Sequence, residues 1–89
     1  MNTNFQPKAM EDIAWWAENN VRMLRKIWNL ISIIRRTPYE GAGQPEQLKY
    51  HLAGTWSRRI DQEHRLVYRV DEDRNEVIII SCKDHYTGL

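Results

Sequence analysis

The spacing of apolar residues divides this chain of 89 residues into a helical first half and a strand-like second half. Residues 7–19 and 21–37 carry apolar residues three and four positions apart, which is typical of helices that cover a core. Pro7 suits the first turn of the first helix, and Asn19-Asn20 separates the two helices. Arg35 and Arg36, followed by Pro38, mark the end of the second helix. Ahead of both helices, "TNFQ" predicts a short strand.

The two predicted helices differ in the width of their apolar faces. In the first, a single narrow face predicts the buried side, with Met10, Ile13, Ala14 and Ala17. In the second, the apolar residues form a wider arc, with Met23, Leu24, Ile27, Leu30, Ile31 and Ile34. This arc predicts packing on a sheet, and its width makes a homodimer plausible.

The second half of the chain alternates apolar and polar residues as strands do. Residues 37–45 ("TPYEGAGQP") are rich in turn residues, and "DEDRN" predicts a hairpin turn. The alternation puts Arg58 and Arg59 on opposite sides of one strand, and Leu66, Tyr68 and Val70 opposite Arg65, Val67 and Arg69. The nearly continuous "EVIIISC" indicates a central strand. We therefore expect an α+β fold in which two N-terminal helices pack on one face of a small antiparallel sheet, with residues 1–89 forming a single domain.

The net charge of +1 conceals an uneven distribution along the chain. Residues 21–69 carry ten Lys or Arg against four acids, whereas the other residues carry three against eight. Such a segment can bind a polyanion locally, although solvated helix and strand faces would give the same count. The single cysteine, Cys82, excludes an intramolecular disulfide, and no residues have the spacing of a zinc site. The chain has no apolar run long enough to span a membrane, so we expect a reduced, cytoplasmic setting.

A family resemblance rests on the basic half of the chain and its end. The stretch "RRTPYEGAGQPEQLKYHLAGTWSRRIDQEHRLVYRV", followed by "HY", resembles the YoeB branch of the RelE/ParE toxin superfamily of small bacterial proteins. The resemblance covers nearly the whole chain and joins the turn, an acid, the basic strands and the terminal pair in order. The chain departs from the family pattern at Asp84, where an aromatic residue is common, and in the three residues that follow the pair.

This resemblance implies a RelE-like toxin fold and ribosome-dependent cleavage of mRNA in the decoding site, without a metal or other cofactor. It also implies a YefM-like antitoxin as the cognate partner. The ribosome and mRNA would be further partners, and DNA would be contacted only indirectly, through the antitoxin complex. No membrane partner is expected.

The resemblance also marks candidate site residues. It implies a catalytic role for Glu46, Arg65, His85 and Tyr86, and RNA-phosphate binding for Lys49 and Arg59. Cleavage through the ribose 2′-OH needs a base, an acid and donors for the extra phosphate charge, and these residue types supply them. Glu46 and His85 are the candidates for base and acid, in an order that the sequence does not decide. Tyr86 could stack on an unpaired base or order the substrate backbone.

Plainer interpretations exist for the remaining residues. We expect Arg58 to make a surface ion pair or to contact the antitoxin, and His51 and His64 to be structural or surface residues. The four tryptophans are expected in the core or at an interface, and Cys82 as a small buried apolar residue. Two further functions remain open, namely a non-enzymatic ParE-like module that inhibits gyrase or acts as a co-repressor, and a catalytically impaired homologue.

Overall fold

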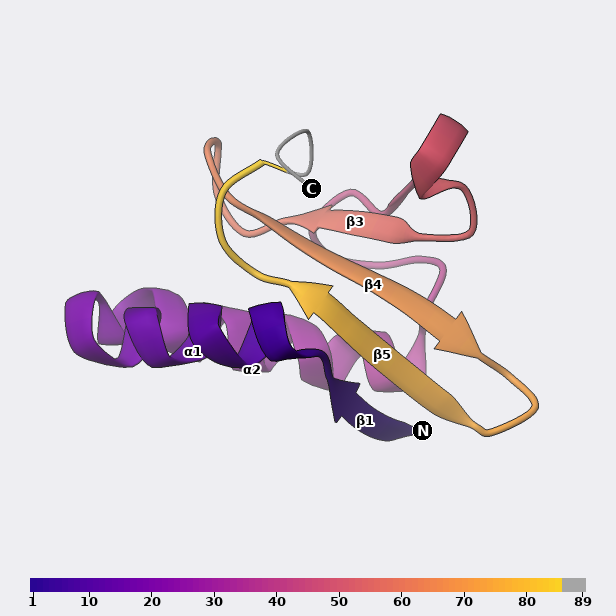
Figure 1. Ribbon diagram of the computed structural model, residues 1–89, viewed down its shortest axis with the longest axis horizontal. Helices are drawn as coiled ribbons and strands as arrows, with labels where there is room; N and C mark the ends of the chain where they lie inside the picture. The colour runs from indigo at the N-terminus through magenta and orange to yellow at the C-terminus, as the bar shows by residue number, and fades with distance from the viewer. Residues whose placement is uncertain (86–89) are drawn as a thin grey trace.

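The computed structural model describes residues 1–85, and its elements follow the predicted order of helices and strands (Figure 1). A short strand precedes two consecutive helices, and the remaining strands come after them. The elements are β1 (Asn2–Phe5), α1 (Pro7–Asn19), α2 (Val21–Arg36), β2 (Glu46–Gln47), a 3-10 turn (Tyr50–Leu52), β3 (Trp56–Arg59), β4 (Arg65–Asp71) and β5 (Glu76–Ser81). The α+β class is therefore confirmed, as is the break between the helices, where the Asn20 side chain accepts a hydrogen bond from the Met23 N–H.

The strands form one five-stranded sheet in the order β1-β5-β4-β3-β2. Every neighbouring pair is antiparallel except β1 and β5, which run in the same direction (Figure 1). The predicted small antiparallel sheet is thus confirmed, with a parallel pair at this edge. The first strand pairs with the last one. The direction of β1 in the sheet therefore depends on a contact between the two ends of the sequence and not on a local sequence pattern.

The hydrophobic core lies between the two helices and one face of the sheet. On the helix side it contains Ile27, Leu30, Ile31 and Ile34 of α2, as the wide apolar arc predicted, together with Ala9 and Trp16 of α1. On the sheet side it contains Leu66, Tyr68, Val77 and Ile79. The central strand β5 also buries Ile78, which agrees with its nearly continuous apolar sequence.

The predicted buried face of α1 is wrong. Met10 is 55% exposed, and Ala14 and Ala17 are exposed as well, whereas Asp12 and Trp16 are buried. Asp12 is buried because its carboxylate accepts a hydrogen bond from the Cys82 N–H at 2.9 Å, and Lys8 contacts the same carboxylate at 2.7 Å. The apolar pattern did not predict the buried face of α1 because that face contains a polar residue, Asp12, which is hydrogen-bonded.

The prediction that Arg58 lies at the surface is also wrong, because this side chain is fully buried. The alternation correctly puts it opposite Arg59, but that side of β3 faces the core. Its guanidinium donates to the carbonyl oxygens of Thr37, Glu40 and Ala42 and to the Tyr68 hydroxyl, at 2.6–3.1 Å. These bonds replace the hydrogen bonds to water that the guanidinium loses on burial. They also hold the turn between α2 and β2 against the sheet.

Candidate active site on the open sheet face

The strand register gathers polar side chains on the sheet face that points away from the helices. Residues paired directly across neighbouring strands point to the same face. Glu46 pairs with Ser57, and Arg59 pairs with Arg65, whereas the core residue Leu66 pairs with Arg58 on the opposite face. We call the face that carries Glu46, Ser57, Arg59 and Arg65 the polar sheet face. The structure therefore brings three of the predicted site residues, from three strands, onto one surface.

Glu46 and Arg59 are diagonal neighbours on the polar sheet face. Glu46 lies opposite Ser57, two residues before Arg59, and such diagonal positions are about 7–8 Å apart, within reach of long side chains. Arg59 follows directly on the same strand as the buried Arg58, and its N–H donates to the Gly43 carbonyl at 2.7 Å. Gly43 has φ +87°, and a Cβ there would lie 3.0 Å from the Arg58 Cβ, so glycine permits this close approach.

Glu46 and Lys49 line a shared pocket of about 380 Å³ next to the short strand β2. Both side chains are exposed, as is Tyr50, which lines the same pocket. Tyr50 is 89% exposed and has a φ of 59°, in the left-handed region that residues other than glycine rarely adopt. Sequence reasoning gave this residue no role. An exposed aromatic ring beside an acid and a lysine can stack on an unpaired base.

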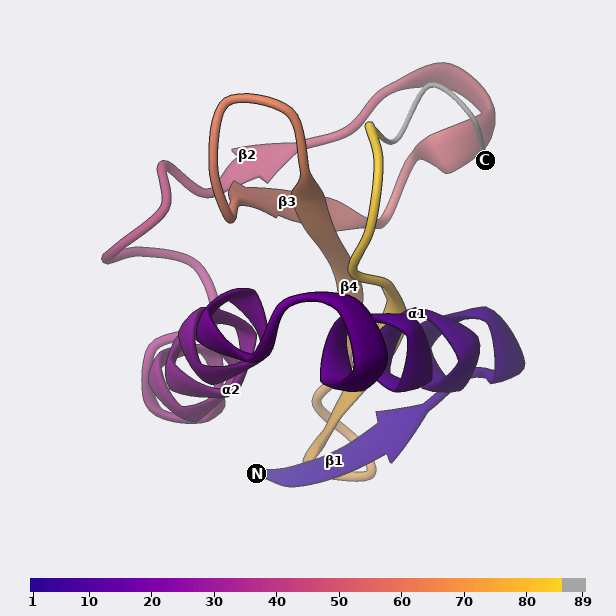
Figure 2. The same ribbon diagram turned by 90° about the vertical axis from the view of Figure 1, so that its left-hand side faces the viewer.

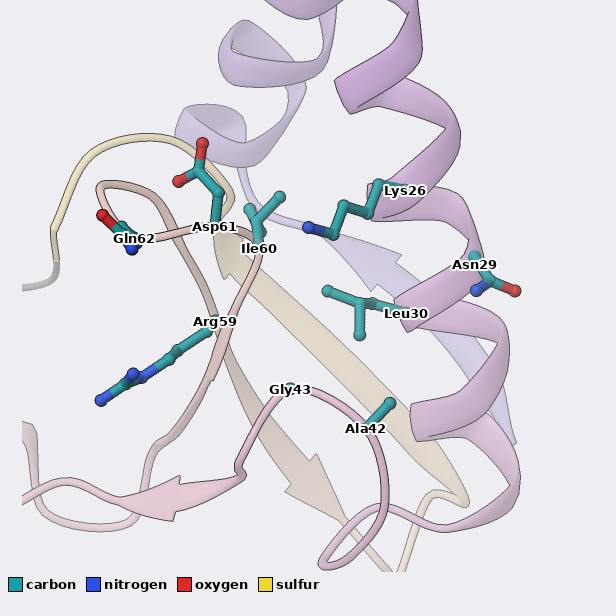
Figure 3. Close-up of a pocket in the computed structure, with 9 residues that line it drawn as sticks. All are labelled: Lys26, Asn29, Leu30, Ala42, Gly43, Arg59, Ile60, Asp61 and Gln62. Atoms are coloured by element: carbon teal, nitrogen blue, oxygen red, sulfur yellow. The ribbon is translucent and has the colours of Figure 1, made fainter.

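Arg65 is fixed by the loop that precedes it. One terminal nitrogen of its guanidinium donates to the carbonyl oxygens of Asp61, Gln62 and His64 at 2.8, 3.3 and 3.1 Å. The rest of the guanidinium keeps its other donors. The side chain is half-buried and already ordered by these bonds. It therefore loses less conformational entropy when an anion binds than a mobile side chain would. Figure 3 shows the neighbouring Arg59 extending away from helix α2.

The loop between β3 and β4 is shaped by Asp61. Its carboxylate accepts hydrogen bonds from the N–H groups of Glu63 and His64 at 2.9 and 2.7 Å. Burial raises the pKa of Asp61, but these two N–H groups and the nearby Lys26 charge lower it by more, so its pKa lies below the usual 3.8. An ionised Asp61 therefore supports the loop that holds Arg65.

The chain after β5 runs toward the loop that joins β3 to β4 (Figures 1 and 2). The Arg65 N–H donates to the Asp84 carbonyl at 2.9 Å, and the Asp84 N–H donates to Nδ1 of His64 at 2.8 Å. His85 itself is exposed. Tyr86, the other member of the predicted pair, lies outside the described residues.

Two residues of α1 also hold the end of the chain. The Trp16 Nε1–H donates to the Cys82 carbonyl at 2.8 Å, and the Lys83 ammonium lies 4.7 Å from the centre of the Trp15 ring. The Trp16 ring meets the His64 ring edge-on at 4.8 Å. Together with His64, these contacts position the segment that carries His85. His64 was expected to be structural or a surface residue. Its position directly before Arg65 in "EHRLVY" is the only sequence feature that points to its contact with the segment before His85.

Cys82 is fully buried, as predicted. Burial, followed by the nearby Asp12 charge, raises the pKa of its thiol to about 12, so it stays protonated and unreactive in the folded protein. Among residues 1–85, no three His, Cys, Asp or Glu side chains come together where they could hold a metal ion. No helix in the same part of the chain is long and apolar enough to cross a membrane.

The whole chain can be compared with known proteins. Residues 5–86 match the model of a family described as the YoeB-like toxin of bacterial type II toxin-antitoxin systems. Toxin YoeB of Escherichia coli K12 is 45% identical over 86 residues, which cover 97% of this chain and 100% of that protein. Two solved structures from Staphylococcus aureus each cover 97% of this chain and 98% of their own. They are a YoeB-YefM complex, at 48% identity and a TM-score of 0.86, and a YoeB dimer, at 47% and 0.87.

Proposed function

This chain belongs to the YoeB-like toxins of bacterial type II toxin-antitoxin systems, and we propose that it is a ribosome-dependent mRNA endoribonuclease that needs no metal. One observation supports this most strongly. The strand register places an acid, Glu46, on the same open face as two arginines, Arg59 and Arg65. A carboxylate can act as the base and arginines can stabilise the charge on the phosphate, so this face offers two of the three functions that RNA cleavage through the 2′-OH uses.

Glu46 and His85 serve as base and acid in this proposal. One takes the proton from the ribose 2′-OH as that oxygen attacks phosphorus, and the other gives a proton to the leaving 5′-oxygen. Each such group contributes about 10²- to 10⁴-fold when correctly placed. The order of the two roles stays open, and both side chains are exposed, so both can reach a bound RNA strand.

Arg65 stabilises the negative charge that develops on the phosphate. Its guanidinium is already oriented by three loop carbonyls, so little reorganisation is needed at the moment of reaction. Arg59, which pairs with it across the strands, and Lys49, which shares a pocket with Glu46, bind the neighbouring phosphates. Tyr86 is proposed to stack on or order the substrate, as the family resemblance implies.

The partners follow from the same proposal. The Staphylococcus aureus complex pairs YoeB with YefM, and we propose that a YefM-like antitoxin silences this chain by covering the polar sheet face. The ribosome and its mRNA are the targets, in the cytoplasm, with residues 1–89 acting as one toxin domain. Contact with DNA would run only through the antitoxin complex. A homodimer is proposed as well, by analogy with the Staphylococcus aureus dimer.

Primer extension on a translated mRNA with purified ribosomes tests the proposed activity. The intact protein is expected to cut at fixed codon positions, and Glu46→Gln and His85→Ala should each lower the cleavage rate about 100-fold or more. Glu18→Gln, which changes an exposed acid on α1 in the same way, should cut normally. A well-folded intact protein that makes no cuts but blocks gyrase supercoiling would replace this proposal with the non-enzymatic one.

A further inference from the structure

Helix α1 binds both backbone polar groups of Cys82, the first residue after β5. The Asp12 carboxylate accepts a hydrogen bond from the Cys82 N–H at 2.9 Å, and the Trp16 Nε1–H donates to the Cys82 carbonyl at 2.8 Å. Asp12 and Trp16 are four positions apart, so they lie on the same side of the helix. The exposed fraction of each of these three residues is 4% or less, so both bonds are shielded from water.

These two side chains replace a neighbouring strand. The pairing of β1 with β5 ends at Ile79, whose carbonyl accepts a hydrogen bond from the Gln6 N–H at 2.9 Å. Three residues later, the acceptor and the donor that a strand would offer come from Asp12 and Trp16 instead. Helix α1 packs against β5 (Figure 1). The direction of the chain after β5 therefore depends on α1.

Asp12 is itself held in place. Its other carboxylate oxygen accepts a hydrogen bond from the Lys8 ammonium at 2.7 Å, one helical turn earlier. Hydrogen bonds that involve a charged group are roughly twice as strong as neutral ones, and they are short and directional. An apolar contact between α1 and β5 would stabilise the packing but would not fix where the next residues point. The bonds at Cys82 therefore specify a direction as well as adding stability.

Little chain separates these bonds from the candidate site. His85 follows Cys82 by three residues, which span about 10 Å when extended. Asp84, between them, is tied to His64 and Arg65 by hydrogen bonds of its backbone. The segment is thus held by α1 on one side and by the start of β4 on the other. A shift at Cys82 has few residues over which to be absorbed before it reaches His85.

We propose that Asp12 and Trp16 are positioning residues for His85, the candidate acid or base. Neither of them contacts the RNA, and both act through the backbone of Cys82. A displacement of about 1 Å in a catalytic group can cost about 100-fold in rate, so bonds this close to His85 matter for the reaction. This inference rests on the proposed cleavage of mRNA. It gives α1 a role in the site although this helix supplies no candidate site residue.

Steady-state cleavage of ribosome-bound mRNA tests the inference. Trp16→Phe keeps a ring but removes the Nε1–H donor, and it should lower kcat about tenfold or more. KM should change less than about twofold, because the arginines proposed to bind phosphate are on the polar sheet face. Trp28→Phe makes the same change at a tryptophan of α2 that is 44% exposed. This matched control should leave kcat and KM unchanged.

Asp12 allows a rescue experiment. Asp12→Ala removes the acceptor and should lower kcat about tenfold or more, as Trp16→Phe does. Asp12→Asn keeps an acceptor for the Cys82 N–H and should recover most of that rate. If Asp12 only stabilised the fold, kcat of both variants would follow their melting temperatures, and the inference would be wrong.

NMR reads the position of His85 without cleavage. In the free protein, the resonances of the His85 ring are identified by their loss in His85→Ala. They should shift in Asp12→Ala, which removes no ring, and stay in place in Asp12→Asn and Trp28→Phe. Unchanged resonances in a folded Asp12→Ala variant, or a Trp16→Phe variant that keeps its kcat, would overturn the inference. An intact protein that cuts no mRNA would reject the proposed function, and the His85 resonances would still decide this inference.

Discussion

Nδ1 of His64 accepts a hydrogen bond from the backbone N–H of Asp84, at 2.8 Å, and so ties the residue before His85 to the start of β4. The acceptor role leaves the ring proton on Nε2, which lies 3.3 Å from the Glu63 carboxylate. Since Arg65 donates its N–H to the Asp84 carbonyl, two hydrogen bonds fix the chain next to the arginine proposed to bind phosphate.

His64 is therefore expected to act as a positioning residue for His85. His64→Phe keeps a ring against Trp16 but removes the acceptor, and it should lower the mRNA cleavage rate about tenfold or more, because small displacements of a catalytic group are costly. His64→Asn can restore an acceptor near Nδ1 and should recover most of that rate. The melting temperature of both variants serves as the control. If His64 had a purely structural role, the cleavage rate of each variant would fall in proportion to its melting temperature, and His64→Asn would not selectively recover the rate.

Arg58 is predicted to be essential for folding rather than for function. Arg58→Met keeps most of the volume but leaves the Tyr68 hydroxyl and three carbonyl oxygens without their donor. We expect the free energy of unfolding to fall by about 3 kcal/mol or more, measured by urea denaturation. Arg58→Lys should be intermediate, since one ammonium cannot reach all four acceptors. Arg59→Met, the exposed neighbour, should change stability by less than about 0.5 kcal/mol. Equal effects at both positions would contradict the buried network.

Tyr50 is predicted to contribute to RNA binding by stacking. Tyr50→Ala should raise KM for ribosome-bound mRNA about tenfold, since stacking of a base on an aromatic ring is worth about 1–3 kcal/mol. Tyr50→Phe keeps the ring and should behave like the intact protein. The ring is almost fully exposed, so neither change should lower the melting temperature. An unchanged KM in the alanine variant would show that the exposed ring does not contact RNA.

The loop that holds Arg65 should lose support at acidic pH. The pKa of Asp61 is lower in the folded protein than its usual 3.8, so its ionised form stabilises the fold above that pH, and this contribution disappears as pH falls through the folded-state pKa. Asp61→Asn lacks the charge at every pH. The stability difference between the intact protein and Asp61→Asn should therefore be constant above about pH 4.5 and shrink below about pH 4. Thermal unfolding followed between pH 2 and pH 7 measures it, and a constant difference across the range would contradict the prediction.

Local sequence determined much of this protein. Helix α2 follows from apolar residues at helical spacing that end at Arg35, Arg36 and Pro38, because these signals act within a few residues of one another. Strand β5 is predicted by its run of β-branched residues. The burial of Cys82 is predicted by its place directly after that apolar run. The candidate site residues came from short motifs that resemble a known family, and their roles remain proposals.

Contacts between distant parts of the chain decided the rest. Asp12 is buried because the Cys82 N–H, 70 positions away, needs an acceptor, so the face of α1 could not be read from its own apolar pattern. The alternation in β3 separated Arg58 from Arg59 but could not tell which one faces the core. That depends on where the helices pack and on carbonyls supplied by the turn at residues 37–42. The register that puts Glu46, Arg59 and Arg65 on one surface, and the hydrogen bond from Asp84 to His64, likewise exist only once separate strands and loops meet.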